Sequence, residues 1–246
     1  MNVLVIDIGG TSVKILASGQ VEPRKFLSGP TMTVAQMASG VKKLATGWKY
    51  DRVSIGYPGV VKHNQPVTEP HNLAQGWVKF DYVKAFGCPV KIINDAALQA
   101  LGSYNGGTLL FLGLGTGLGS TMIVDNVVVP MELAHLPYRK ATYEDYVGVR
   151  AIERLGQKKW RKQVEDVVEQ LTAALRPDDV VLGGGNSKRL KELPPGCRLG
   201  DNDNAFLGGF RMWGTPAAKA KATPKPKPKP RVGKRKSSVP AKKRSR

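Results

Sequence analysis

The amino-acid sequence predicts an α/β fold of two similar lobes, and three observations predict it. Short β-branched runs alternate with stretches of helical periodicity along most of the chain. A unit of strand, glycine turn and strand occurs twice, near Gly9 and near Gly115. The 28 glycines accompany 41% apolar residues, a combination that indicates tight backbone approaches in a folded body.

The first half of the chain is expected to begin with a hairpin and to continue with alternating strands and helices. β-Branched runs predict strands, and apolar spacings of three and four predict helices. Residues 3–6 and 13–17 are the expected strands of the hairpin, and residues 53–57 and 90–93 are two further expected strands. The expected helices are residues 33–46, 81–86 and 96–104.

The second half repeats the strand–glycine–strand unit and then becomes mostly helical after Pro137. A buried strand that ends in three glycines interrupts the helices. The expected strands are residues 108–112, 121–124, 127–129 and 180–182, and the expected helices are residues 143–155, 158–175 and 202–213.

The charge of the chain divides it into a folded body and a tail. The net charge is +19, but residues 215–246 hold 13 Lys or Arg and no acidic residue, which leaves a net charge of +6 on residues 1–214. The segment 215–246 is rich in Lys and Pro and has too few apolar residues to form a core, so we expect a disordered basic tail. Such a tail suits either solvation or non-specific binding of nucleic acid and other polyanions.

Several classes of protein are excluded by composition. No apolar run reaches the roughly 18 residues of a membrane helix, and Asp7 interrupts the apolar start, which argues against a signal peptide. Cys88 and Cys197 have no spacing typical of a disulfide framework or a zinc site. We therefore expect a cytoplasmic protein with reduced thiols and no membrane contact.

Two glycine-rich turns could each cradle a phosphate. The first runs from Asp7 through Gly9, Gly10 and Thr11 to Lys14, and the second is 113–120, with Gly115, Thr116 and Gly117 at its centre. Glycines let successive backbone N–H groups converge on an anion, and Asp7 would need Mg²⁺ between itself and a phosphate. Each turn alone could be an ordinary hairpin, but two in one chain favour phosphate binding.

Three further groups of residues could complete a site. Asn94 and Asp95 follow a buried strand, where an Asp can accept a hydroxyl proton, although a helix N-cap is the common alternative. Glu132 and His135, with Glu144 further on, could hold vicinal sugar hydroxyls or form surface ion pairs. Gly184 and Gly185 end a strand and permit close approach of a phosphorylated or flat ligand, or simply a turn.

Taken together and in this order, these motifs resemble the ROK family of sugar kinases within the actin-like ATPase superfamily, and its short branch of polyphosphate glucokinases in particular. The resemblance covers residues 2–213. It rests on D-I-G-G-T-x-x-K at 7–14, P-G-V at 58–60, N-L-x-x-x-W at 72–77, N-D-A at 94–96, G-x-G-T-G-x-G-S at 113–120, E-L-x-H at 132–135 and L-G-G-G at 182–185.

The resemblance implies a two-lobed actin-like (ribonuclease H-like) kinase domain over residues 1–214. Its small lobe would be residues 1–94 plus the closing helix 202–213, and its large lobe 95–201. Asp95 would be the general base, and the sugar ligands would be Asn94, Glu132, His135 and Glu144. The phosphate or nucleotide ligands would be Asp7, Gly9, Gly10, Thr11, Lys14, Gly115, Thr116, Gly117, Gly184 and Gly185, with Asp7 also holding the metal.

The activity that the resemblance implies is transfer of a terminal phosphoryl group from polyphosphate or ATP, with Mg²⁺, to the 6-hydroxyl of glucose. Long-branch members carry a cysteine-rich zinc motif after E-x-x-H, whereas residues 137–144 contain no Cys, so no structural zinc is expected. A homodimer is implied as well. An ATP-dependent kinase of another hexose or amino sugar stays open as an alternative. A sugar-sensing repressor is disfavoured because no helix-turn-helix precedes the first strand.

Overall fold

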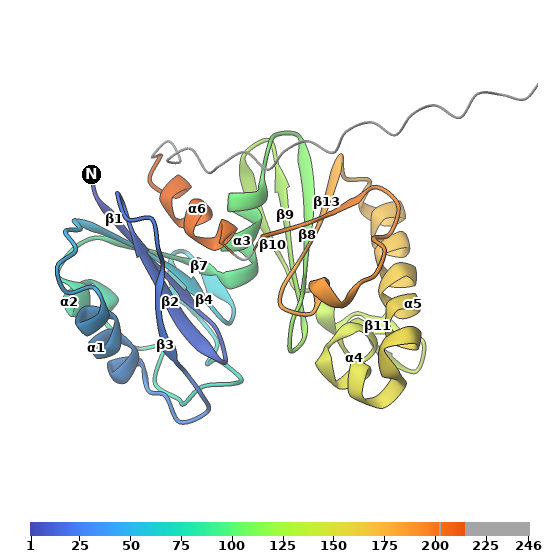
Figure 1. Ribbon diagram of the computed structural model, residues 1–246, viewed down its shortest axis with the longest axis horizontal. Coiled ribbons are helices and arrows are strands. Elements are labelled where there is room, and N and C mark those ends of the chain that lie inside the picture. The colour runs from blue at the N-terminus through green and yellow to red at the C-terminus, as the bar shows by residue number, and fades with distance from the viewer. Residues whose placement is uncertain (202, 215–246) are drawn as a thin grey trace, which may run out of the picture.

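The computed structural model describes residues 1–201 and 203–214, which form two five-stranded β-sheets with helices between and outside them. Figure 1 shows the sheets as two separate layers, with α3 and α6 between them and α1 and α5 on the two outer sides. The expected two-lobed α/β fold is therefore confirmed. The predicted tail, residues 215–246, lies outside the described residues.

The first sheet has the strand order β3-β2-β1-β4-β7. β2 is antiparallel to both β1 and β3, whereas β4 is parallel to both β1 and β7. The strands are β1 (Val3–Ile8), β2 (Ser12–Ala17), β3 (Arg24–Leu27), β4 (Arg52–Tyr57) and β7 (Val90–Asn94), and the outer helices are α1 (Val34–Leu44) and α2 (Tyr82–Phe86).

The second sheet repeats this plan with the order β10-β9-β8-β13-β14 and the same pattern of directions. Its strands are β8 (Thr108–Leu114), β9 (Leu118–Val124), β10 (Val127–Met131), β13 (Asp179–Gly183) and β14 (Cys197–Leu199), and its helices are α4 (Tyr143–Val147) and α5 (Val149–Leu175). The two predicted glycine turns consequently occupy equivalent positions, each between the first two strands of its sheet.

The side-chain alternation of β1 decides which way Asp7 faces. Leu4, Ile6 and Ile8 pack into the core beneath the outer helices, whereas Val3 and Val5 pack against Leu98 and Phe206 of the central helices. Because successive side chains of a strand point to opposite faces, Asp7 belongs to the Val3 and Val5 face. The carboxylate therefore faces the middle of the molecule, between the two sheets.

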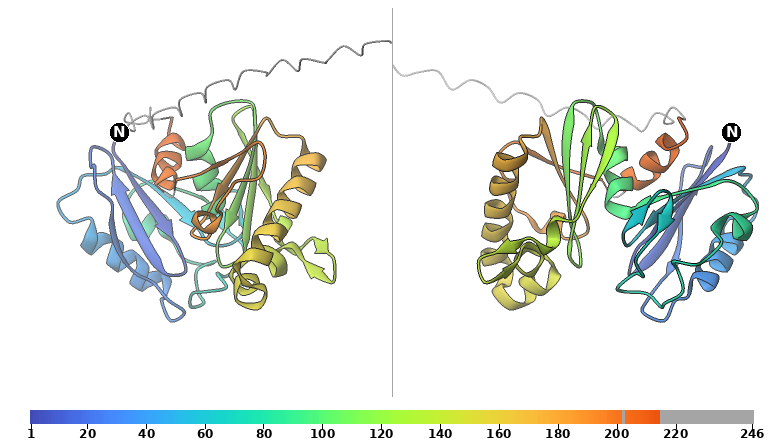
Figure 2. Two further views of the ribbon diagram at one scale, coloured as in Figure 1. Left: turned by 45° about the vertical axis from the view of Figure 1, so that its right-hand side comes forward. Right: turned by 180° about the vertical axis from the view of Figure 1, so that it is seen from behind.

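Helices α3 (Asp95–Ser103) and α6 (Asn204–Arg211) join the two lobes, as Figure 2 shows from two further directions. Leu98 of α3 packs with the first sheet, while Ala96 and Ala100 pack with the second. The two helices cross closely, because a Cβ at Gly102 or Gly208 would overlap backbone atoms of the other helix. The first residue of α3, Asp95, is thereby placed where the two lobes meet.

Some elements differ from those that the sequence predicts. The helix expected over residues 143–155 breaks at Gly148, and α5 continues to Leu175 with a kink at Gly156, whose φ is 73°. Strands β8 and β9 extend further into the glycine turn than expected, and α6 is shorter than residues 202–213. The unpredicted strands are β3, β14 and the hairpins β5 (Val61–Lys62) with β6 (Gln65–Pro66) and β11 (Pro137–Tyr138) with β12 (Ala141–Thr142).

No helix in the described part of the chain is both long and apolar enough to cross a membrane.

Candidate functional site

Asp7 lies at the end of β1, opposite Lys14 of β2 and beside Gly56 of β4. The Lys14 ammonium lies 3.6 Å from an Asp7 carboxylate oxygen. Burial raises the pKa of Asp7, and the positive charge of Lys14 works in the opposite direction. A carboxylate and an ammonium group therefore stand together beside the first glycine turn, as the sequence predicts.

Asp95 follows β7 directly and is half-buried between the lobes. Its Oδ1 accepts a hydrogen bond of 2.9 Å from the backbone N–H of Ala96. Burial, together with the negative charges of Asp7 and Glu132, raises the pKa of Asp95 to about 7, and the hydrogen bond from Ala96 opposes the rise. Since Asp7 belongs to the first sheet and Glu132 follows the last strand of the β8–β10 meander, Asp95 lies within the electrostatic reach of both lobes.

Asn94 is the N-cap of α3, which is the structural alternative that the sequence leaves open for this position. Its Oδ1 caps α3 by accepting hydrogen bonds from the N–H groups of Ala96, at 2.9 Å, and Ala97, at 3.3 Å. Its amide nitrogen donates to the carbonyl of Gly59 at 3.2 Å. An amide nitrogen has two hydrogens, so one remains for a ligand, while the oxygen is already engaged.

The first glycine turn presents backbone donors to solvent. The N–H of Gly9 closes the turn on the carbonyl of Ser12, at 3.0 Å. The N–H groups of Gly10 and Thr11, both exposed, donate to no other group of the described chain. Asn72 packs against Gly10, where an added Cβ would lie 3.3 Å from the Asn72 Cβ. Two adjacent N–H groups are thus left without a partner in the described chain, and their binding of an anion stays a prediction.

The second glycine turn is held in shape by a residue from a distant turn. The N–H of Gly115 bonds to the carbonyl of Gly117 at 3.1 Å, and the Asn186 amide donates to the carbonyl of Gly115 at 2.8 Å. The N–H groups of Thr116 and Gly117 donate to no other group of the described chain. The second glycine turn thus has two N–H groups without a partner in the described chain, like its counterpart in the first sheet.

Gly184 lets the turn that carries Asn186 approach the second glycine turn closely. Its φ is +79°, and an added Cβ would lie 2.5 Å from the carbonyl oxygen of Leu114. The turn after β13 therefore packs directly on the backbone that leads into the second glycine turn. By contrast, Gly185 has nothing within 4 Å of an added Cβ. Of these two predicted ligand-binding glycines, Gly184 is a packing requirement and Gly185 is the open position.

Glu132 and His135 lie together, but Glu144 contacts a different part of the site. The His135 Nε2 is 3.9 Å from a Glu132 carboxylate oxygen, and both side chains are exposed around the 3₁₀ helix η1 (Leu133–His135). The Glu144 carboxylate accepts a hydrogen bond from the N–H of Leu118 at 3.4 Å and pairs with Arg150 at 3.5 Å.

Glu144 also fills the space beside Gly117, where an added Cβ would overlap its carboxylate. In this structure its carboxylate supports the second glycine turn, and its role in sugar binding stays a prediction. Three other contributors were not predicted as site residues: Asn72, Arg150 and Asn186. Asn72 and Asn186 stand inside motifs that the sequence does display, directly before Leu73 and after Gly185, which was the available signal.

The residues present fit Mg²⁺. Within residues 1–201 and 203–214 no three His, Cys, Asp or Glu side chains cluster as a metal site. Mg²⁺ needs fewer protein ligands, because it is usually held by one or two carboxylates together with substrate phosphates and water. The charge of Asp7 raises the pKa of Asp95, so a divalent cation near both carboxylates would relieve their repulsion.

The raised pKa of Asp95 predicts a specific dependence of stability on pH. The folded pKa is about 7 against an ordinary value of 3.8, so the folded state binds the extra proton between these values. The contribution of Asp95 to the free energy of unfolding is therefore fully present below about pH 4, and it is lost as the pH rises to about 7. We expect Asp95→Asn to be more stable than the wild type by roughly 1–3 kcal/mol at pH 8, with almost no difference at pH 4.

Urea denaturation at the two pH values measures this difference. The matched control is Asp125→Asn, which changes an exposed carboxylate in the turn between β9 and β10. It should leave the stability difference between the two pH values as it is in the wild type. An effect of Asp95→Asn on stability that is equal at pH 4 and pH 8 would contradict the raised pKa of Asp95.

Comparisons with known proteins identify a family, related sequences and solved structures of the same fold. The ROK family profile matches residues 3–130. The chain is 28% identical over 216 residues to polyphosphate glucokinase of Mycobacterium tuberculosis, a match that covers 77% of this chain and 80% of that protein. It is 30% identical over 213 residues to polyphosphate glucokinase of Mycobacterium leprae, covering 77% of this chain and 65% of that one.

Solved structures share the fold. The inorganic polyphosphate/ATP-glucomannokinase of Arthrobacter sp. strain KM superimposes with a TM-score of 0.73 at 26% identity, over 86% of this chain and 97% of that one. A ROK family glucokinase from Streptomyces griseus, solved with glucose and AMPPNP, gives a TM-score of 0.72 at 16% identity, over 86% and 99%. The latter likeness concerns the fold alone.

The repeated five-stranded sheets around α3 and α6 define the class of the protein as the two-lobed actin-like ATPase fold. Within that class the chain belongs to the ROK family.

Proposed function

We propose that the protein is a sugar kinase that transfers the terminal phosphoryl group of polyphosphate or ATP to the 6-hydroxyl of glucose, forming glucose 6-phosphate. The observation that carries the proposal is the placement of Asp95. Its carboxylate lies between two sheets that each present a glycine turn, and it has a pKa of about 7. A general base is most effective when its pKa is close to the working pH.

In the proposed reaction, the carboxylate of Asp95 accepts the proton of the 6-hydroxyl while that oxygen attacks the terminal phosphorus. The new O–P bond forms as the bond from phosphorus to the bridging oxygen of the donor breaks. Phosphoryl transfer passes through a loose transition state, so positioning and charge stabilisation do most of the work. Lys14 and the outward N–H groups of the two glycine turns would supply that stabilisation.

The sugar would be held by groups on both sides of Asp95. Asn94 offers its remaining amide hydrogen from the first lobe, and Glu132 and His135 are exposed on the second. Glucose hydroxyls that bond to them would bring the 6-hydroxyl to the base. When bound, Mg²⁺ would neutralise charge on the donor phosphates, with Asp7 as the carboxylate that holds it.

Both donors fit the phosphate turns, and the relatives support both. The mycobacterial relatives are named polyphosphate glucokinases, and the Arthrobacter enzyme is named an inorganic polyphosphate/ATP-glucomannokinase. The name glucomannokinase also makes mannose the first alternative acceptor to compare with glucose.

A side-by-side assay tests the function. Purified protein with Mg²⁺ and glucose should form glucose 6-phosphate with polyphosphate, ATP or both, as detected by a coupled dehydrogenase. Because the net charge is +19, polyphosphate activity should fall more steeply with salt than ATP activity does. Equal salt slopes would contradict preferential polyanion binding, and an absence of product with either donor would overturn the proposed function.

A further inference from the structure

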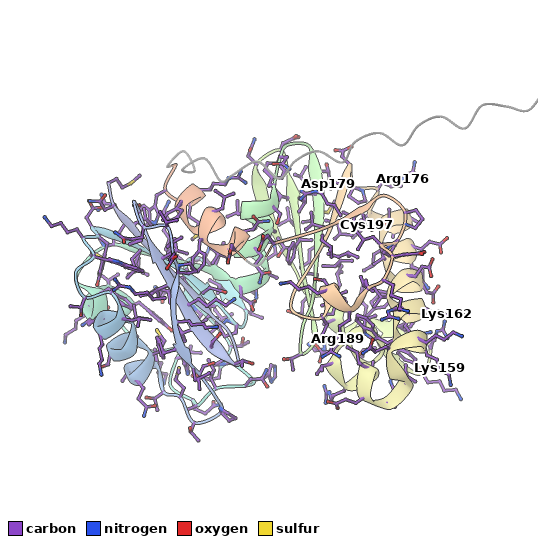
Figure 3. All side chains as sticks on the ribbon, viewed as in Figure 1. Lys159, Lys162, Arg176, Asp179, Arg189 and Cys197 are labelled. Carbon is purple, nitrogen blue, oxygen red and sulfur yellow. The ribbon has the colours of Figure 1, made fainter. Side chains whose placement is uncertain are left out.

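A basic surface outside the proposed reaction centre occupies two neighbouring segments of the second lobe. One segment is the middle of α5, residues 157–162, and the other is residues 188–191, which include the end of the 3₁₀ helix η2 (Ser187–Arg189). The residues of this α5–η2 basic surface are Lys158, Lys159, Arg161, Lys162, Lys188, Arg189 and Lys191. All are exposed except Arg161, which is half-buried, and Figure 3 labels Lys159, Lys162 and Arg189 among them.

The surface connects directly to the second glycine turn. The Arg161 Nε donates to the carbonyl of Arg189 at 2.8 Å, which joins α5 to η2. The Ser187 hydroxyl at the start of η2 donates to the carbonyl of Gly184 at 2.8 Å. From there, Asn186 reaches the carbonyl of Gly115 at 2.8 Å. A continuous set of contacts thus leads from the phosphate turn outward to the basic residues.

The positive charges on this surface outnumber the acids that border it, which are Glu165, Asp166 and Glu192. Residues 154–164 and 180–191 contain no Asp or Glu. None of the seven basic side chains forms an ion pair within the described part of the chain. Lys158 and Lys162 stand four residues apart on α5 and repel each other. Asp166 stands four residues after Lys162, but its carboxylate is already paired with Arg139 at 3.0 Å. The excess of positive charge on this surface would attract an extended anion.

We propose that the α5–η2 basic surface binds the distal part of a long inorganic polyphosphate chain whose terminal phosphoryl group lies at the two glycine turns. This proposal rests on the proposed function, because it assigns the donor of the same site. Each further phosphate of the chain adds a negative charge that this surface can neutralise. ATP carries its charge on three phosphates only and gains nothing from basic residues further along the path.

The test removes three charges from α5 in the full-length protein. We expect K158Q/K159Q/K162Q to raise the KM for long-chain polyphosphate about tenfold. The KM for tripolyphosphate and for ATP should stay within about twofold of the wild type. The slope of log KM against log salt for long chains should fall by about 2, since each neutralised contact contributes roughly 0.7 for a single-stranded polyanion.

The matched control removes three exposed lysines from the first lobe. K42Q/K43Q/K84Q changes the net charge by the same amount on α1 and α2. It should leave the KM for long chains within about twofold. An equal effect of both triple variants, or an equal rise for ATP, would show a general charge effect and overturn the proposal.

A direct binding measurement separates this proposal from the proposed function. Labelled long-chain polyphosphate is titrated without glucose, and single-stranded DNA of similar charge is titrated in parallel. Weaker polyphosphate binding in the α5 variant, with DNA binding unchanged, supports the proposal even if the wild type phosphorylates no sugar. Loss of DNA binding with unchanged polyphosphate binding would overturn it and mark a nucleic-acid surface instead.

Discussion

Replacing Asp95 with Asn is expected to lower kcat for glucose phosphorylation by a factor of about 10²–10⁴, the range typical of a positioned general base. Asn cannot accept the hydroxyl proton, but its oxygen can still accept the hydrogen bond from the Ala96 N–H that Asp95 accepts now. The start of α3 and the sugar contacts should therefore persist, and the Kd for glucose should stay within about threefold. Initial rates at saturating donor and calorimetric titration of glucose measure the two quantities.

The control for this variant is again Asp125→Asn, which removes one exposed carboxylate at the end of β9 opposite the second glycine turn. Near-normal turnover of Asp95→Asn would remove Asp95 as the base. Loss of glucose binding in proportion to the loss of kcat/KM would instead make Asp95 a sugar ligand.

Replacing Gly184 with Ala is expected to raise the KM for either donor by at least about tenfold and to lower stability by roughly 1–3 kcal/mol. The new Cβ would occupy a residue with φ of +79° and lie 2.5–2.8 Å from three backbone atoms of Leu114. Backbone cannot move aside as a flexible side chain can, so the turn after β13 and residues 114–117 must separate. Donor kinetics, glucose titration and thermal unfolding together measure the effect, and the Kd for glucose should change little.

Gly185→Ala is the matched control, because nothing lies within 4 Å of its added Cβ and its φ is not positive. Donor KM and stability should therefore stay close to wild type. Equal losses in both variants would mean that the turn tolerates no side chain at all. No loss in Gly184→Ala would show that the contact with Leu114 does not shape the phosphate turn.

The parts of the site that the sequence predicts well are those set by local chemistry. The Asp7–Lys14 pair faces across one hairpin, so its contact follows from a short glycine turn and strand alternation. The second turn around Gly115 follows from the same pattern. Asp95 could be placed near the site because it directly follows a strand of the first sheet and begins a helix.

The parts that the sequence does not predict depend on residues distant in the chain. Asn186 supports Gly115 across 71 positions, and Glu144 reaches Leu118 across 26, and neither contact leaves a local pattern. The edge strands β3 and β14 pair with partners whose position is fixed only after the sheets form. Gly148 also ends α4 at a break that helical periodicity alone cannot reveal.

The pH dependence of kcat/KM for glucose tests most directly whether Asp95 is the general base, when it is compared between the wild type and Asp95→Asn. Burial and the charges of Asp7 and Glu132 raise the pKa of Asp95 to about 7. The ionised form is the base, so wild-type kcat/KM should fall about tenfold per pH unit below a midpoint near 7. The residual activity of Asp95→Asn should lack this acidic limb, and the same limb in the variant would contradict the assignment.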